Sequence, residues 1–213
     1  MLTRDHAAEI FDKLRGLSSA DEVELLISSG NSALTRFANN TIHQNVSEDN
    51  IQISVRVSFG GRTARATTNK SDDDSLHRVV QSAEALASVQ QDDADLLPMP
   101  SPEEAKSSVA SPSRHFENTA RLTPQDRAAA VAQMVDVAKK NRLTTAGVYS
   151  SSEVVEGLFN SRGVAHWYEQ TLAEVSITML ADNSSGWQKA NSPDARQVDH
   201  VRMAEVAAQK AID

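Results

Sequence analysis

The clearest pattern in the chain is an alternation of apolar and polar residues over residues 51–59. The apolar positions are Ile51, Ile53, Val55, Val57 and Phe59, and the polar positions between them are Gln52, Ser54, Arg56 and Ser58. A period of two places the two sets on opposite faces of a β-strand. Gly60-Gly61 predicts a hairpin turn, because glycine reaches positive φ without steric cost. The return strand, 62–67, is small and polar, which is typical of a sheet edge.

Further strands are predicted where short apolar runs are bounded by turn residues. They cover residues 22–28, 34–37, 41–46, 146–151, 153–159 and 164–180. Gly30-Asn31-Ser32, Asn39-Asn40 and Asn160-Ser161-Arg162-Gly163 are the expected turns between some of them.

Apolar residues at helical spacing predict four helices. The first covers about residues 4–16, the second follows Ser71, the third follows Thr123, and the last begins at Ser192-Pro193-Asp194. Ser71 with Asp74 is the expected cap of the second helix. Thr123 at the N-cap, with Pro124 at the first helical position and Asp126 at the third, is the expected cap of the third helix.

Residues 89–118 differ in composition from the rest of the chain. Four of the six prolines fall here, together with many serines, and such a segment favours a linker over a core. The sequence therefore predicts two small units, 1–88 and 119–213. Each is expected to be an antiparallel sheet packed with helices, which is an α+β fold.

Composition narrows the functional classes. The 213 residues carry a net charge of -8, which disfavours direct contact with nucleic acid or an anionic membrane surface. There is no cysteine, so disulfides, thiolate zinc sites and thiol nucleophiles are excluded. No apolar run approaches the roughly 18 residues of a membrane span, and the first residues lack the apolar region of a secretory signal. We expect a soluble, cytoplasmic protein.

No catalytic residue and no metal ligand is predicted in this chain. None of the six histidines has another histidine three or four residues later, as a His-Glu-x-x-His site would require. No Gly-x-Ser-x-Gly elbow and no phosphate-binding loop is present. Asp72-Asp73-Asp74 is interpreted as a helix cap, with a calcium or magnesium site as the weaker alternative.

Strand edges are the candidate peptide-binding surface, because an edge can accept an extended peptide through main-chain hydrogen bonds. The candidate groove residues are Arg62, Arg65, Asn160, Ser161, Arg162 and Trp187. The competing interpretation is that the edges are ordinary polar edges and that Trp187 packs in a core.

Several motifs together resemble the TldD/PmbA family. Residues 36–44, Arg-Phe-Ala-Asn-Asn-Thr-Ile-His-Gln, resemble its early R-F-x-N-x-x-I-x-Q signature. The strand, glycine turn and strand of residues 51–67 follow, and Asn160-Ser161-Arg162-Gly163 resembles the family's N-S-x-G turn. The resemblance extends over about residues 20–212.

The resemblance implies a place in a family of cytoplasmic zinc metallopeptidases, historically called modulators of DNA gyrase. Their zinc site is a His-Glu-x-x-x-His motif plus a cysteine in a C-terminal domain. This sequence has neither feature, so no zinc ligand and no cofactor is carried over to it. The chain is expected to be a fragment or the product of a short gene.

The implied function is the N-terminal, substrate-groove and subunit-pairing portion of such a peptidase. The implied partners are a peptide or unfolded polypeptide substrate and a family member, in a homo- or heterodimer. Two alternatives remain open: a stand-alone, non-catalytic regulatory module that pairs with a full-length member, and an unrelated small hydrolase with a serine site.

Overall fold

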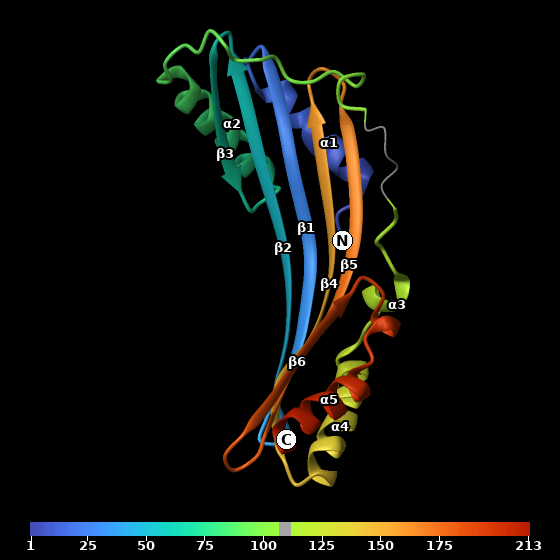
Figure 1. Cartoon of the computed structure of the whole chain (residues 1–213). Coiled ribbons are helices and arrows are strands. Elements are labelled where there is room, and N and C mark those ends of the chain that lie inside the picture. Colours follow the sequence, from blue (N-terminus) through green and yellow to red (C-terminus); the bar gives the residue numbers. More distant parts are fainter. Residues whose placement is uncertain (107–111) are drawn as a thin grey trace. The chain divides into compact units, whose positions relative to one another are not determined.

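The computed structural model describes residues 1–106 and 112–213, and its described elements are α-helices and β-strands, which confirms the predicted α+β class. The strands are β1 (Glu22–Ala38), β2 (Thr41–Phe59), β3 (Arg62–Thr68), β4 (Thr144–Asn160), β5 (Ala165–Leu180) and β6 (Ser185–Ser192). They form one sheet in the order β3-β2-β1-β4-β5-β6 (Figure 1). None of the described helices is long and apolar enough to cross a membrane.

The chain forms two compact units, and neither is continuous in sequence. Unit 1 contains Met1–Gly30, Asn50–Pro112 and Val155–Tyr168, whereas unit 2 contains Asn31–Asp49, Ser113–Val154 and Glu169–Asp213. The long strands β1, β2, β4 and β5 contribute residues to both units. The predicted division of the chain into domains 1–88 and 119–213 stays a prediction.

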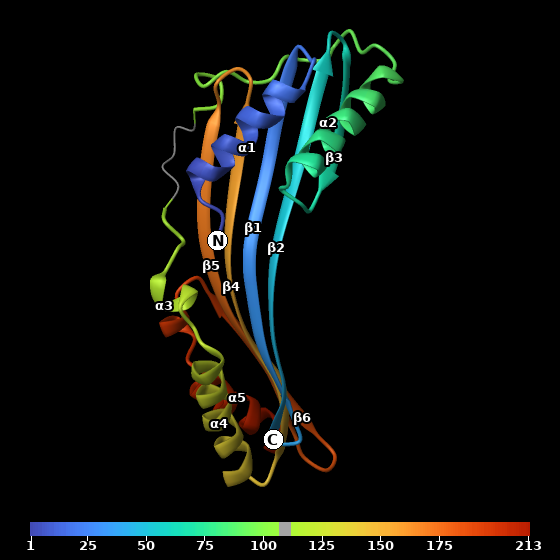
Figure 2. The same ribbon diagram turned by 180° about the vertical axis from the view of Figure 1, so that it is seen from behind.

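Unit 1 packs two helices, α1 (Arg4–Leu17) and α2 (Asp73–Ser88), against one face of its strands (Figure 2). The strands supply the apolar residues that stand at every second position, here called the apolar phase. Of these, Val23, Leu25, Ile53 and Val55 are almost fully buried. The helices supply Ile10, Phe11, Leu14, Leu76 and Val79 to the same core. Phe11 stacks on Phe159 with ring centroids 6.0 Å apart. The other face of these strands carries the polar phase.

The cap of α2 differs from the sequence prediction. Asp72 is the N-cap, and its carboxylate accepts a hydrogen bond from the backbone N–H of Ser75. This bond holds the pKa of Asp72 below its usual value. Ser71 was predicted to be the cap, but any of several neighbouring Ser and Asp residues satisfies the same local rule. By contrast, the predicted capping box of Thr123 and Asp126 is confirmed.

The segment between α2 and residue 106, here called the connecting segment (residues 89–106), belongs to unit 1. The backbone N–H of Asp93 donates to Gly61, and that of Met99 donates to the Glu22 carboxylate at 3.0 Å. Met99 is only 2% exposed. The described part of the predicted linker is therefore anchored by specific contacts, while residues 107–111 lie outside the described residues.

Unit 2 packs α4 (Pro124–Lys140) and α5 (His200–Ile212) into a second core. Its strand residues include Phe37, Tyr149, Val175 and Ile177. Two short elements, α3 (Glu117–Ala120) and the 3-10 turn η1 (Ala195–Gln197), contact each other in this unit. The last α-helix begins after Asp199, not at Ser192 as predicted, because residues 193–199 form η1 and its flanking bends.

Two predicted turns behave differently. Asn39 and Asn40 form the predicted reversal, with φ of 50° and 59°. Gly30-Asn31-Ser32 is not a turn but part of β1. The Asn31 amide instead donates across the sheet to Ser47 and, at 2.9 Å, to Asp49. Likewise, the two strands predicted at 146–151 and 153–159 are one strand, β4.

Asp194 links α3 to η1 and makes the stability of unit 2 depend on pH. Its buried carboxylate accepts hydrogen bonds from the Arg196 guanidinium, the shortest at 2.7 Å, and from the Asn118 amide at 2.6 Å. The Arg196 bonds, followed by the Asn118 bond, hold the pKa of Asp194 well below its usual value.

A carboxyl group whose folded pKa is depressed stabilises the fold above its unfolded pKa, and that contribution is lost as the pH falls towards the folded pKa. Asp194→Asn should therefore lower the thermal midpoint at pH 7. The difference from the wild type should shrink below about pH 4, the ordinary aspartate range. Thermal unfolding of both proteins between pH 7 and about pH 2.5 measures the difference in midpoint. A difference that does not change with pH would contradict the prediction.

Candidate functional site

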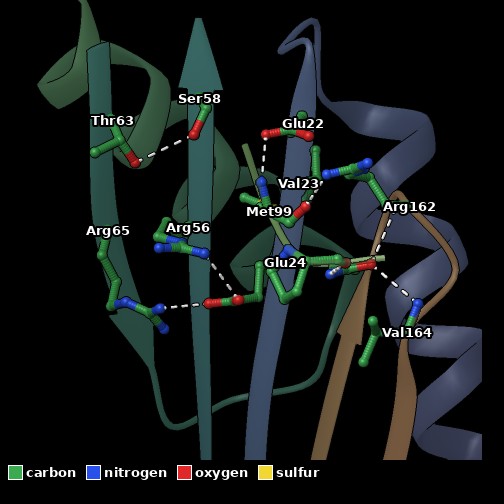
Figure 3. A network of polar contacts seen from close by, with 12 residues as sticks. Glu22, Val23, Glu24, Arg56, Ser58, Thr63, Arg65, Met99, Arg162 and Val164 are labelled. Carbon is green, nitrogen blue, oxygen red and sulfur yellow. Dashed lines mark hydrogen bonds and ion pairs between the residues drawn. The ribbon is translucent and has the colours of Figure 1, made fainter. Parts of the chain in front are cut away.

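The polar face of unit 1 holds a cluster of two arginines and one glutamate (Figure 3). Glu24 on β1 points away from the helices and accepts from Arg56 Nη2 at 3.0 Å and from Arg65 Nη2 at 2.6 Å. Arg65 Nη1 also donates to the Ser54 hydroxyl at 3.0 Å. The two arginines face each other because the Gly60-Gly61 hairpin pairs Arg56 with Arg65 in register.

The cluster has two guanidinium groups but only one carboxylate, so one positive charge is not neutralised within it. The Glu24 side chain is 8% exposed, whereas those of Arg56 and Arg65 are 32% and 36% exposed. Arg56 Nε is buried without a hydrogen-bond partner in the part of the chain that the structure describes. Guanidinium groups bind carboxylates through a planar fork of donors, and a single shared carboxylate leaves donors of both forks unused.

A second polar network connects the turn after β4 to the connecting segment. Asn160 is 2% exposed, and its amide donates to the Pro100 carbonyl at 2.8 Å. Its side-chain oxygen accepts from the backbone N–H groups of Arg162 and Val164, both at 3.0 Å. Arg162 donates to the Met99 carbonyl. This arrangement fixes the turn and the connecting segment together.

The predicted groove residues of unit 1 therefore occupy four different settings. Asn160 and Arg162 hold the connecting segment, and the Ser161 hydroxyl accepts from the backbone N–H of Val23 at 3.1 Å. Arg62 forms an ion pair with Asp92 at 3.3 Å. Arg65 belongs to the cluster with Glu24 and Arg56, and its side chain is 36% exposed. Peptide contact by these residues stays a prediction.

Trp187 belongs to unit 2 and is 56% exposed, so it is not the core residue of the competing interpretation. It pairs with Thr178 on β5, and its indole N–H donates to the Ser176 hydroxyl at 3.1 Å. Nearby, Lys189 forms an ion pair with Glu174 at 2.9 Å. A hollow of about 300 Å³ in this unit is lined by Leu34, Val46, Ser150, Leu172 and Glu174, among others.

The donor set does not fit a zinc site within residues 1–106 and 112–213. No three histidine, aspartate or glutamate side chains converge there as metal ligands would. The sequence has no cysteine. His115 Nε2 lies 2.8 Å from Glu153 Oε1, which is a two-residue contact.

Sequence reasoning missed Glu24 and Arg56 as site residues. A signal was present, because the two-residue glycine turn fixes the register of the hairpin and places Arg56 opposite Arg65. Like charges directly opposite each other are destabilising, so the register itself predicts a nearby carboxylate. The sequence does not show which carboxylate, because the neighbouring strand is set by long-range pairing.

Two family models match consecutive parts of the chain. Residues 23–87 match the model described as PmbA/TldA metallopeptidase domain 1. Residues 117–213 match the model described as the PmbA/TldA metallopeptidase central domain. No curated protein matches the chain at a significant level.

Three solved structures share the fold at low sequence identity. TldE from Thermococcus kodakarensis superimposes with a TM-score of 0.83 at 14% identity, covering 97% of this chain and 47% of that protein. A candidate modulator of a DNA gyrase from Thermotoga maritima gives 0.80 at 14% identity, covering 97% of this chain and 48% of that protein.

A candidate modulator of DNA gyrase from Bacteroides thetaiotaomicron gives a TM-score of 0.78 at 16% identity, with 100% of this chain and 50% of that protein covered. The chain thus spans about half the length of each of these proteins. The two family matches together cover most of the chain, which therefore belongs to the PmbA/TldD family and carries the family's domain 1 and central domain.

Proposed function

We propose that this chain is the substrate-groove and subunit-pairing portion of a TldD/PmbA-type metallopeptidase that acts on peptides. The observation that carries the proposal is the pair of consecutive matches to domain 1 and the central domain of that family. In this proposal the zinc chemistry belongs to residues outside this chain. The described residues have no convergent ligand set that could activate a water molecule.

Binding and pairing are tasks that the described surfaces can perform. Each unit buries the apolar phase of its strands under helices, and side chains of the polar phase stay partly exposed on both units. An extended peptide can lie on such strands or add to an edge without any catalytic group on them. A partner subunit that brings the metal site would complete the enzyme.

The test is recovery of the tagged chain from an extract of its own cells, with peptide cleavage assayed in the recovered complex. We expect a family member in the complex, cleavage that a zinc chelator abolishes, and no cleavage by the purified chain alone with added zinc. Zinc-dependent cleavage by the chain alone would contradict the proposal. Labelling of the chain by an active-site serine probe would instead support the hydrolase alternative.

The same experiment separates the non-catalytic regulatory alternative. In that case the recovered partner is already active alone, and adding the chain changes its cleavage rate without being required for it. In the proposed function, a partner that lacks its own domain 1 and central domain gains activity only when the chain is added.

A further inference from the structure

The charges of the Glu24–Arg56–Arg65 cluster do not balance. One arginine would neutralise the Glu24 carboxylate, yet Arg56 and Arg65 both donate to it. The second guanidinium is left with a net positive charge on the polar face of a chain whose net charge is -8. Two arginines opposite each other are costly unless anions lie between or upon them.

The cluster also has donors to spare on its solvent side. In the described residues, Glu24 is the only hydrogen-bond partner of the Arg56 side chain, and Arg65 uses two donors, one on Glu24 and one on Ser54. About a third of each arginine side chain is exposed. An anion approaching from solvent can therefore reach both guanidinium groups without displacing Glu24.

We propose that Arg56 and Arg65 form a carboxylate-binding site that takes an acidic side chain of an extended peptide. The inference rests on the proposed peptide-binding function and names the kind of peptide. A single carboxylate matches the single surplus charge, whereas a phosphate group would bring a charge of about -2. Charge-assisted bonds from arginine to a carboxylate are the strong, directional kind that fix a ligand in register.

The surroundings suit a peptide. Beyond the Ser54–Thr67 pair lies a hollow of about 500 Å³ in unit 1, within the usual range for ligand sites. It is lined by Ser28, Asn50, Ile51, Gln52, Thr67, Thr68 and Asn69. Hydroxyl and amide groups at that place can accept and donate hydrogen bonds to peptide groups without selecting a sequence. Selectivity then comes from the arginine pair.

The test compares two labelled flexible peptides, one of Gly, Ser and Glu and one with Gln in place of Glu, by fluorescence anisotropy at low salt. The wild-type chain should bind the Glu peptide about 10-fold more tightly than the Gln peptide. Arg56→Gln should remove that preference, and it leaves Glu24 paired with Arg65. Arg15→Gln, on an exposed position of α1, makes the same charge change and should alter binding by less than about twofold.

Each other outcome counts against the site. Equal losses in Arg56→Gln and Arg15→Gln would mean that only net charge matters. Equal binding of both peptides would overturn the carboxylate site while leaving peptide binding intact, and no binding of either would contradict both proposals. If inorganic phosphate displaced the Glu peptide far better than acetate does, the site would bind phosphate groups and not carboxylates. Should Arg56→Gln unfold, Glu24→Gln must tighten binding of the Glu peptide, because it frees both arginines.

Discussion

Replacing Gly186 with alanine should destabilise unit 2 by about 3 kcal/mol or more. Gly186 lies in β6 directly beneath α5, and a Cβ atom added there would be 2.0 Å from the Ala207 carbonyl oxygen and 2.7 Å from Lys210 Cβ. Because the closest neighbour is backbone, relief requires a shift of the whole helix against the strand. Thermal or urea unfolding followed by circular dichroism measures the loss.

Gly16→Ala is the matched control for this prediction. Gly16 lies in α1, and a Cβ atom there meets nothing within 4 Å. Alanine is favoured over glycine inside a helix by about 0.5–1 kcal/mol, so this variant should be neutral or slightly stabilised. A Gly186→Ala variant with the same midpoint as Gly16→Ala would show that α5 does not pack against β6 this closely.

Elements that depend on local signals could be predicted from the sequence. Thr123 caps α4 because its hydroxyl and the Asp126 carboxylate satisfy backbone groups three residues apart. Asn39-Asn40 and Gly60 reverse the chain because these residue types tolerate positive φ. In each case the residues that decide the conformation are neighbours in sequence.

Elements that depend on distant partners were predicted less well. Gly30-Asn31-Ser32 has the composition of a turn, yet Asn31 is held in β1 by bonds to residues of β2. Gly186 is a residue type typical of turns, yet it lies in β6, where it lets α5 approach the strand. Turn propensity describes which backbone conformations a residue can adopt. Packing decides which of these conformations the residue takes in the folded chain.

In the candidate site, too, some contacts are set by neighbouring residues and others by distant segments. The pairing of Arg56 with Arg65 follows from the hairpin and was within reach of the sequence. The third member, Glu24, and the anchoring of Met99 at Glu22 depend on segments tens of residues apart. Asn160 and Arg162 were predicted to be part of a peptide surface, and that stays a prediction. Their contacts with the connecting segment could not be predicted, because the sequence does not show that this segment returns to them.

Asn160→Ala should cost about 2–3 kcal/mol of unfolding free energy. The substitution removes three hydrogen bonds at a site that is 2% exposed, and it leaves the Val164 N–H and the Pro100 carbonyl without their partner. Buried polar groups left unpaired account for most of this cost. We expect a lower thermal midpoint and faster limited proteolysis within residues 93–106.

Asn183→Ala applies the same substitution at an exposed position between β5 and β6, and it should change the midpoint by less than about 1 °C. The comparison also decides between the two interpretations of the Asn160 turn. A binding residue loses peptide affinity when truncated while the fold keeps its stability, whereas a residue that holds the connecting segment loses stability first. Reduced peptide affinity at an unchanged midpoint in Asn160→Ala would support the peptide-contact interpretation, and a lowered midpoint with unchanged affinity in the folded protein would support the structural one.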